Sequence, residues 1–175
     1  MNLVLLTHER EVQRPTNTGS LALQVFPQWC RRVIWSRVAP DQVLIELILS
    51  HSAAVLFPKP TDSCHADVSL DLGEKDKLAP LVGKSEVYLD HVPDTLIILD
   101  ATWQEARKMM RQSPYLKAAD KFALTEQADS GFTLRRNQIE GGLCTIECII
   151  SLLELKNKPE EAELLTQAFR DFQDG

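Results

Sequence analysis

The sequence predicts a single α/β domain built on a mainly parallel sheet flanked by helices. Short runs of large aliphatic residues alternate with longer segments whose apolar residues recur at helical spacing. This alternation is typical of chains in which each strand is followed by a helix that packs on the same sheet. The length of 175 residues suffices for one domain with a sizeable core, and we expect that domain to span residues 1–175.

The first third of the chain supplies three predicted strands and two predicted helices. We expect strands at residues 3–6, 32–35 and 53–57, and helices at residues 20–26 and 42–49. Asp41 is a suitable N-cap for the second helix, because its side chain can accept from a free backbone N–H. Pro58 and Pro60 end the third strand, since proline cannot donate to a sheet.

Residues 59–93 are predicted to form a long acidic loop with one weak strand at 87–89. Between residues 62 and 100, nine acidic residues stand against three lysines. Pro80, Gly83 and Pro93 interrupt any regular structure there. Loops of this length inside a compact domain are often functional.

Residues 96–112 carry the most informative pattern in the chain. An aliphatic strand at 96–99 ends at Asp100, and Thr102 is a suitable N-cap for the basic helix that follows. Ligands of open α/β sheets bind beyond the carboxyl ends of the strands, so Asp100 beside Trp103 is a candidate active-site corner. The spacing equally allows Asp100 to be a mere helix cap and Trp103 to be a core residue.

The last third of the chain is predicted to hold two short strands and two helices. We expect strands at 122–124 and 132–135, a helix at 145–155 after a glycine pair, and a final amphipathic helix at 159–172 within the C-terminal segment 156–175. Trp29 and Trp35 are expected to pack in the core.

Charge and composition exclude several classes of protein. The net charge of −6 argues against a general nucleic-acid binder. Residues 101–136 nevertheless hold seven bases against four acids, so a local basic face is possible. No apolar run approaches the ~20 residues that span a membrane. Without a signal-peptide pattern, we expect a cytoplasmic protein with reduced cysteines.

The common cofactor and nucleophile motifs do not occur. No strand is followed by a glycine-rich dinucleotide or phosphate loop, and there is no Gly-x-Ser-x-Gly turn. The four cysteines, Cys30, Cys64, Cys144 and Cys148, do not have the spacing of a zinc knuckle, so no metal is expected. Dehydrogenases, nucleoside triphosphatases and serine hydrolases are therefore disfavoured.

Five segments, in order, resemble the DTW-domain family. They are the stretch at 9–19 containing Arg14-Pro15-Thr16-Asn17, the turn Leu56-Phe57-Pro58, the name-giving Asp100-Ala101-Thr102-Trp103, Phe132-Thr133-Leu134-Arg135, and the helix start Cys144-Thr145-Ile146-Glu147-Cys148. Cysteine stands at the first and last of these helix-start positions, where the family has Ser and Ala. Many members also carry an N-terminal cysteine cluster that this sequence lacks. The family resemblance therefore leaves open how the protein would bind RNA.

The resemblance implies a tRNA-uridine aminocarboxypropyltransferase. Such enzymes move the 3-amino-3-carboxypropyl group of S-adenosylmethionine to N3 of a tRNA uridine. Their relation to the SPOUT class implies a C-terminal trefoil knot. The expected donor substrate is S-adenosylmethionine, the expected partner is tRNA with no membrane, and the expected state is a monomer or homodimer.

Three groups of site residues follow from this resemblance. The expected catalytic residues are Asp100 as general base, Thr102 and Trp103. The expected donor-binding residues are Leu56, Phe57, Pro58, Leu99, Leu134, Arg135, Leu143, Cys144, Thr145, Ile146 and Glu147, with Arg135 or Arg14 pairing the donor carboxylate. The expected RNA-binding residues are Arg10, Arg14, Asn17, Arg107, Arg111 and Arg136.

Two alternatives stay open at the level of sequence. A SPOUT-class RNA methyltransferase would use the same donor but leave S-adenosylhomocysteine in place of methylthioadenosine. A non-catalytic RNA-binding module would bind no donor at all.

Overall fold

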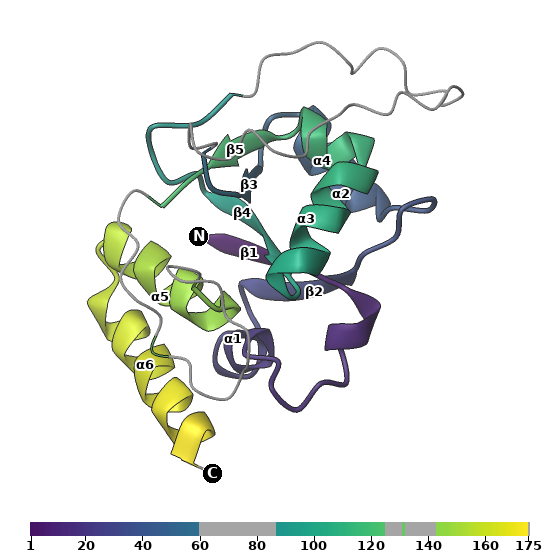
Figure 1. Cartoon of the computed structure of the whole chain (residues 1–175). Coiled ribbons are helices and arrows are strands. Elements are labelled where there is room, and N and C mark those ends of the chain that lie inside the picture. Colours follow the sequence, from purple (N-terminus) through teal and green to yellow (C-terminus); the bar gives the residue numbers. More distant parts are fainter. Residues whose placement is uncertain (60–86, 125–130, 132–142, 175) are drawn as a thin grey trace.

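A parallel five-stranded sheet with helices on both faces forms the centre of the computed structural model, which describes residues 1–59, 87–124, 131 and 143–174 (Figure 1). The strands are β1 (Asn2–Thr7), β2 (Cys30–Ile34), β3 (Ala54–Leu56), β4 (Thr95–Asp100) and β5 (Asp120–Phe122). They lie in the order β2-β1-β4-β3-β5, and every pair is parallel. The predicted α/β class and parallel sheet are confirmed.

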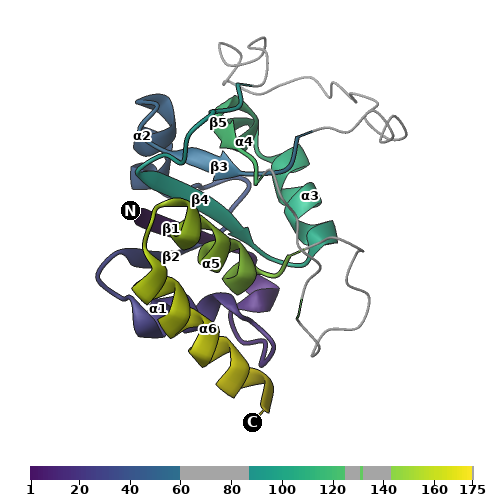
Figure 2. The same ribbon diagram turned by 90° about the vertical axis from the view of Figure 1, so that its left-hand side faces the viewer.

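The described helices lie in two layers. They are η1 (Glu9–Glu11, 3-10), α1 (Gly19–Val25), α2 (Gln42–Leu49), α3 (Trp103–Gln112), α4 (Pro114–Ala118), α5 (Thr145–Leu155) and α6 (Pro159–Asp174). Figures 1 and 2 show α1, α5 and α6 on one side of the sheet and α2, α3 and α4 on the other. None of the described helices is long and apolar enough to cross a membrane.

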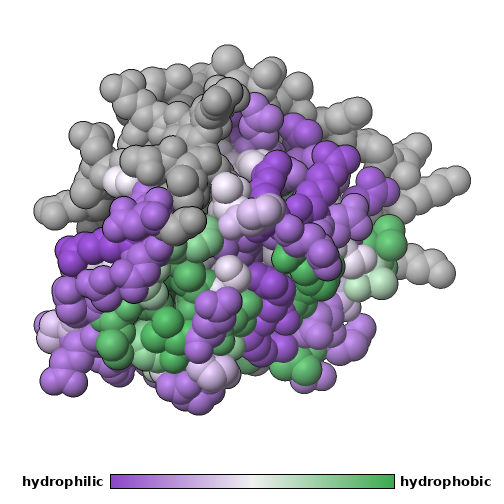
Figure 3. Space-filling model, turned by 90° about the horizontal axis from the view of Figure 1, so that it is seen from below, coloured by the Kyte–Doolittle hydropathy of each residue, from purple (hydrophilic) through white to green (hydrophobic). Residues whose placement is uncertain are grey.

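The two central strands are aliphatic because helices cover both of their faces. Leu5 of β1 faces the core under α1, α5 and α6, and Leu6 faces the core under α2, α3 and α4. Along β4, Ile98 and Ile97 alternate in the same way. The middle of a strand buried on both faces is aliphatic throughout, which explains why these runs are recognisable in the sequence. On the side seen in Figure 3, exposed hydrophobic side chains lie in separate groups among hydrophilic ones.

Most predicted elements are present, with differences at the sheet edge. The weak strand predicted at 87–89 is reduced to a single parallel bridge between Tyr88 and Lys121. The strand expected at 122–124 starts earlier and ends at Phe122. Pro114 occupies the first turn of α4, where its missing N–H costs nothing.

Parts of the prediction lie outside the described residues. These are the strand at 132–135 and most of the acidic loop at 59–93. The trefoil knot also depends on the path of residues 125–142, of which only Gly131 is described. It stays a prediction.

Candidate active site at the carboxyl edge of the sheet

Asp100 ends β4 beside the end of β1, where Thr7 is its partner in the register. The carboxylate is buried, with 1% of the residue exposed. Its Oδ2 accepts from Thr7 Oγ1 at 3.0 Å and from Asn17 Nδ2 at 2.9 Å. Its Oδ1 accepts from Thr145 Oγ1 at 3.0 Å. One carboxylate therefore joins three segments that are far apart in the sequence.

A second layer of contacts orients the Asn17 amide. Asn17 Oδ1 accepts from Ser20 N at 2.9 Å and from an Arg32 guanidinium N–H at 3.2 Å. With its oxygen engaged there, the amide presents its NH₂ group to Asp100. Hydrogen bonds from donors offset the cost of burying the carboxylate, and Arg32 supplies the nearest cation in this chain of contacts.

Gly19, the first residue of α1, lies directly against this carboxylate. A Cβ atom added there would be 2.6 Å from Asp100 Oδ1 and 2.8 Å from its Cγ. Real Cβ atoms essentially never approach so closely, so only glycine fits while Asp100 keeps its three donors.

Gly19→Ala is expected to destabilise the fold by about 1–3 kcal/mol, because a methyl group would be forced into a filled site. The midpoint of urea unfolding measures this loss. Gly131→Ala is the matched control, since its added Cβ would lie at an ordinary 3.8 Å from Glu147 Oε1. Equal urea midpoints for the two variants would show that the residues around Asp100 can move to accommodate the added methyl group.

The start of α5 carries the donor-binding residues predicted at 143–147. Glu147 accepts from Cys144 N at 2.7 Å and from Gly131 N at 2.6 Å, so its carboxylate stabilises the helix start. Ile146 N donates to Thr18 Oγ1 at 3.4 Å. Two of the backbone amides expected to bind the donor are thus engaged within the protein. Burial is the main cause that raises the pKa of the Cys144 thiol, and the nearby Glu147 carboxylate adds to it.

Thr102 caps α3, so the interpretation of Asp100 as a mere helix cap is wrong. Thr102 Oγ1 accepts from Glu105 N at 3.3 Å, and Glu105 Oε2 accepts from Thr102 N at 3.1 Å. Burial alone would raise the pKa of Glu105, but the hydrogen bonds from Thr102 and the charges of His8 and Arg14 lower it overall. The Asp100 side chain therefore does not cap α3 and instead accepts hydrogen bonds from Thr7, Asn17 and Thr145.

Trp103 and Phe57 form an aromatic pair between the ends of β3 and β4. Their ring centroids are 5.8 Å apart and their planes differ by 20°. Trp103 is 38% exposed, so the interpretation of this residue as a core tryptophan is wrong. Trp29 and Trp35, expected in the core, are only partly buried, and Trp35 stacks on His8.

The predicted RNA-binding residues lie in different surroundings. Arg10, Arg107 and Arg111 are exposed. Arg14 is hydrogen-bonded to the buried Glu11. Asn17 is 2% exposed and turned toward Asp100, a position that suits orienting this carboxylate and not contacting RNA.

Leu134, Arg135 and Arg136 lie outside the described residues. Leu56 ends β3 and is followed by Phe57 and Pro58, and Leu99 lies next to the end of β4. Their role in binding the donor stays a prediction. Thr7 and Arg32 were missed. Thr7 ends an aliphatic run just as Asp100 does, which is a usable signal, whereas nothing in the sequence distinguishes Arg32.

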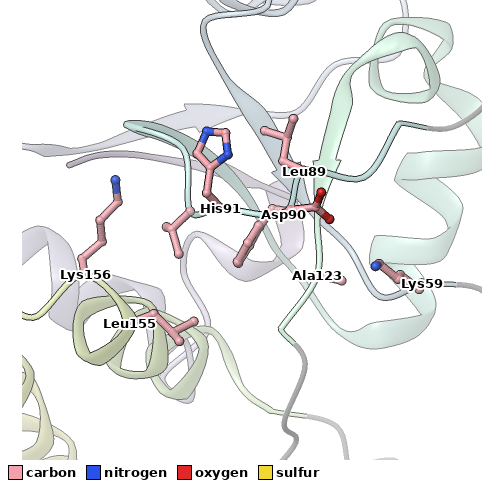
Figure 4. Close-up of a pocket in the computed structure, with 9 residues that line it drawn as sticks. Lys59, Leu89, Asp90, His91, Ala123, Leu155 and Lys156 are labelled. Carbon is pink, nitrogen blue, oxygen red and sulfur yellow. The ribbon is translucent and has the colours of Figure 1, made fainter.

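A separate cavity in the described part of the chain does not include these residues. It measures about 470 Å³ and is lined by Lys59, Leu89, Asp90, His91, Val92, Phe122, Ala123, Leu155 and Lys156. Figure 4 shows Lys59 and Lys156 at opposite ends. Lys156 is also paired with Asp94 at 3.1 Å. Within the described residues, no group of three or more His, Cys, Asp or Glu side chains could hold a metal ion.

Similarity to known proteins extends over almost the whole chain. The family model of the DTW domain matches residues 1–174. A curated relative from Drosophila melanogaster, "tRNA-uridine aminocarboxypropyltransferase 2", is 28% identical over 114 residues, which are 62% of this chain and 45% of the relative. The chain thus spans less than half the length of that relative. No solved structure gives a significant match.

Proposed function

Since the chain belongs to the DTW-domain family, we propose that it is a tRNA-uridine aminocarboxypropyltransferase with S-adenosylmethionine as donor. The family match over almost the whole chain carries this proposal. The name of the Drosophila relative supports it, although the identity is modest. The buried Asp100 corner supports it as well, because the name-giving motif of the family is the centre of the contacts described above.

The proposed donor site lies at the carboxyl edge of the sheet. Three segments meet there: the turn at 56–58, the end of β4 at Leu99, and the start of α5 at 143–147. Ligands of parallel sheets bind in this position. Leu134 and Arg135 complete the proposed set, with Arg135 or Arg14 pairing the donor carboxylate.

Uridine N3 is a poor nucleophile until it loses its proton, so the site needs a base. Asp100 is the proposed base, but its burial leaves no open path to a bound uridine. Thr145 is only partly buried and donates to Asp100 Oδ1, so we propose that its hydroxyl connects the carboxylate to the bound uridine. Oδ1 has this one described donor, whereas Oδ2 has two.

The proposed step uses Thr145 as a relay. The N3 proton passes to Thr145 Oγ while the hydroxyl proton passes to Asp100 Oδ1. The nitrogen lone pair forms the new bond to the aminocarboxypropyl carbon, the bond from that carbon to sulfur breaks, and neutral methylthioadenosine leaves. Alignment supplies much of the remaining rate, because the sulfonium is already a good leaving group.

A labelled donor tests the reaction directly. With unmodified tRNA and S-adenosylmethionine labelled in its carboxyl carbon, we expect label in the tRNA and release of methylthioadenosine. Label confined to S-adenosylhomocysteine, together with a methyl mass increment on the RNA, would assign the chain to the methyltransferases. A calorimetric titration that detects no donor binding would leave only an RNA-binding module.

A further inference from the structure

An exposed aromatic ring stands at the start of a cationic helix beside the site. Trp103 is the first residue of α3, and one of its neighbours is the stacked ring of Phe57. With 38% of the residue in solvent, Trp103 keeps part of its ring available for a ligand. A large aromatic side chain held in place by a second ring is preorganised to stack on a flat molecule.

Three cations continue the same exposed surface of α3. Arg107 and Arg111 follow Trp103 at intervals of four residues, and Lys108 is adjacent to Arg107, so they lie along one side of the helix. No carboxylate in the described part of the chain forms an ion pair with any of the three. The single acid of α3, Glu105, is held by Thr102 and faces His8 at 3.9 Å.

We propose that Trp103 is a stacking platform for an unpaired base of an RNA loop, and that Arg107, Lys108 and Arg111 bind its phosphates. This inference rests on the proposed function, which supplies an RNA substrate. Single-stranded RNA is recognised by aromatic stacking together with cations along the backbone, which is the combination seen here. A protein partner would require a contiguous apolar patch, and the exposed side of α3 offers one ring among charges.

The first arm of the test removes the ring. Trp103→Leu is expected to weaken binding of a short oligouridine about 10-fold, while Trp103→Phe retains most of the affinity. Affinity for an RNA duplex of the same length and for S-adenosylmethionine should not change. Oligouridine should quench tryptophan fluorescence in the natural chain and lose most of that effect in Trp103→Leu.

The second arm removes the charges. The triple variant Arg107→Gln, Lys108→Gln, Arg111→Gln should weaken oligouridine binding and flatten its salt dependence by about 2 logarithmic units per decade of salt. Arg170→Gln on α6 is the control, because this exposed arginine lies on the other side of the sheet. Its effect on both quantities should be negligible.

The outcomes separate this inference from the proposed function. If Trp103→Leu weakens binding of the donor as much as that of RNA, the ring holds the donor adenine and the inference fails. Unchanged oligouridine affinity in both variants also overturns it, even when the natural chain transfers the group to tRNA. Stacking on Trp103 without any group transfer would uphold the inference and refute the proposed function.

Discussion

Asp100→Asn is expected to give a folded protein that binds the donor but transfers the group at least ~100-fold more slowly. The fold survives because the amide can keep all three contacts: its oxygen accepts from Thr7 and Asn17, and its NH₂ donates to Thr145 Oγ1. The amide has the shape of the carboxylate but cannot take up the proton of uridine.

Single-turnover rates with unmodified tRNA, measured beside the melting temperature, test this result. Asp94→Asn is the matched control, because this exposed aspartate lies just before the opposite end of β4 and its side chain pairs with Lys156. Near-normal turnover of the Asp100 variant would show that the carboxylate only positions Thr145, Asn17 and Thr7.

Thr145→Val is expected to reduce transfer by about 100-fold, whereas Thr145→Ser keeps it. Valine has almost the shape of threonine but no hydroxyl, so the proton loses its route to the buried Asp100. The loss of one donor to a buried carboxylate also lowers stability, by about 1–3 kcal/mol. This loss of stability by itself would not show that Thr145 relays the uridine proton.

Thr7→Val separates the two effects. Thr7 donates to the other oxygen of Asp100 and is fully buried, so it can stabilise the carboxylate without reaching a uridine. We expect Thr7→Val to lose a similar amount of stability while keeping most of its rate once folded. Equal losses of transfer in the two valine variants would contradict the relay and assign both threonines to positioning.

Elements with strong local signals can be predicted from the amino-acid sequence alone. The helix at 145–155 has the predicted bounds, and Thr102 and Asp41 cap α3 and α2 as expected. The β4 run was visible because burial on both faces requires unbroken aliphatic residues. The Asp100 motif likewise predicts a site at the end of this strand.

Which side chains meet at Asp100 depends on how the strands and helices pack together. Asn17 is a residue type typical of turns, yet the packing of α1 directs its amide toward Asp100, which lies 83 residues away in the sequence. Thr145 comes to the same carboxylate because α5 covers β4. Arg32 reaches the Asn17 side chain because β2 lies beside β1. Trp103 is exposed since its helix begins beyond the sheet edge. Such contacts depend on the order of strands and on helix packing, which no local pattern of residues encodes.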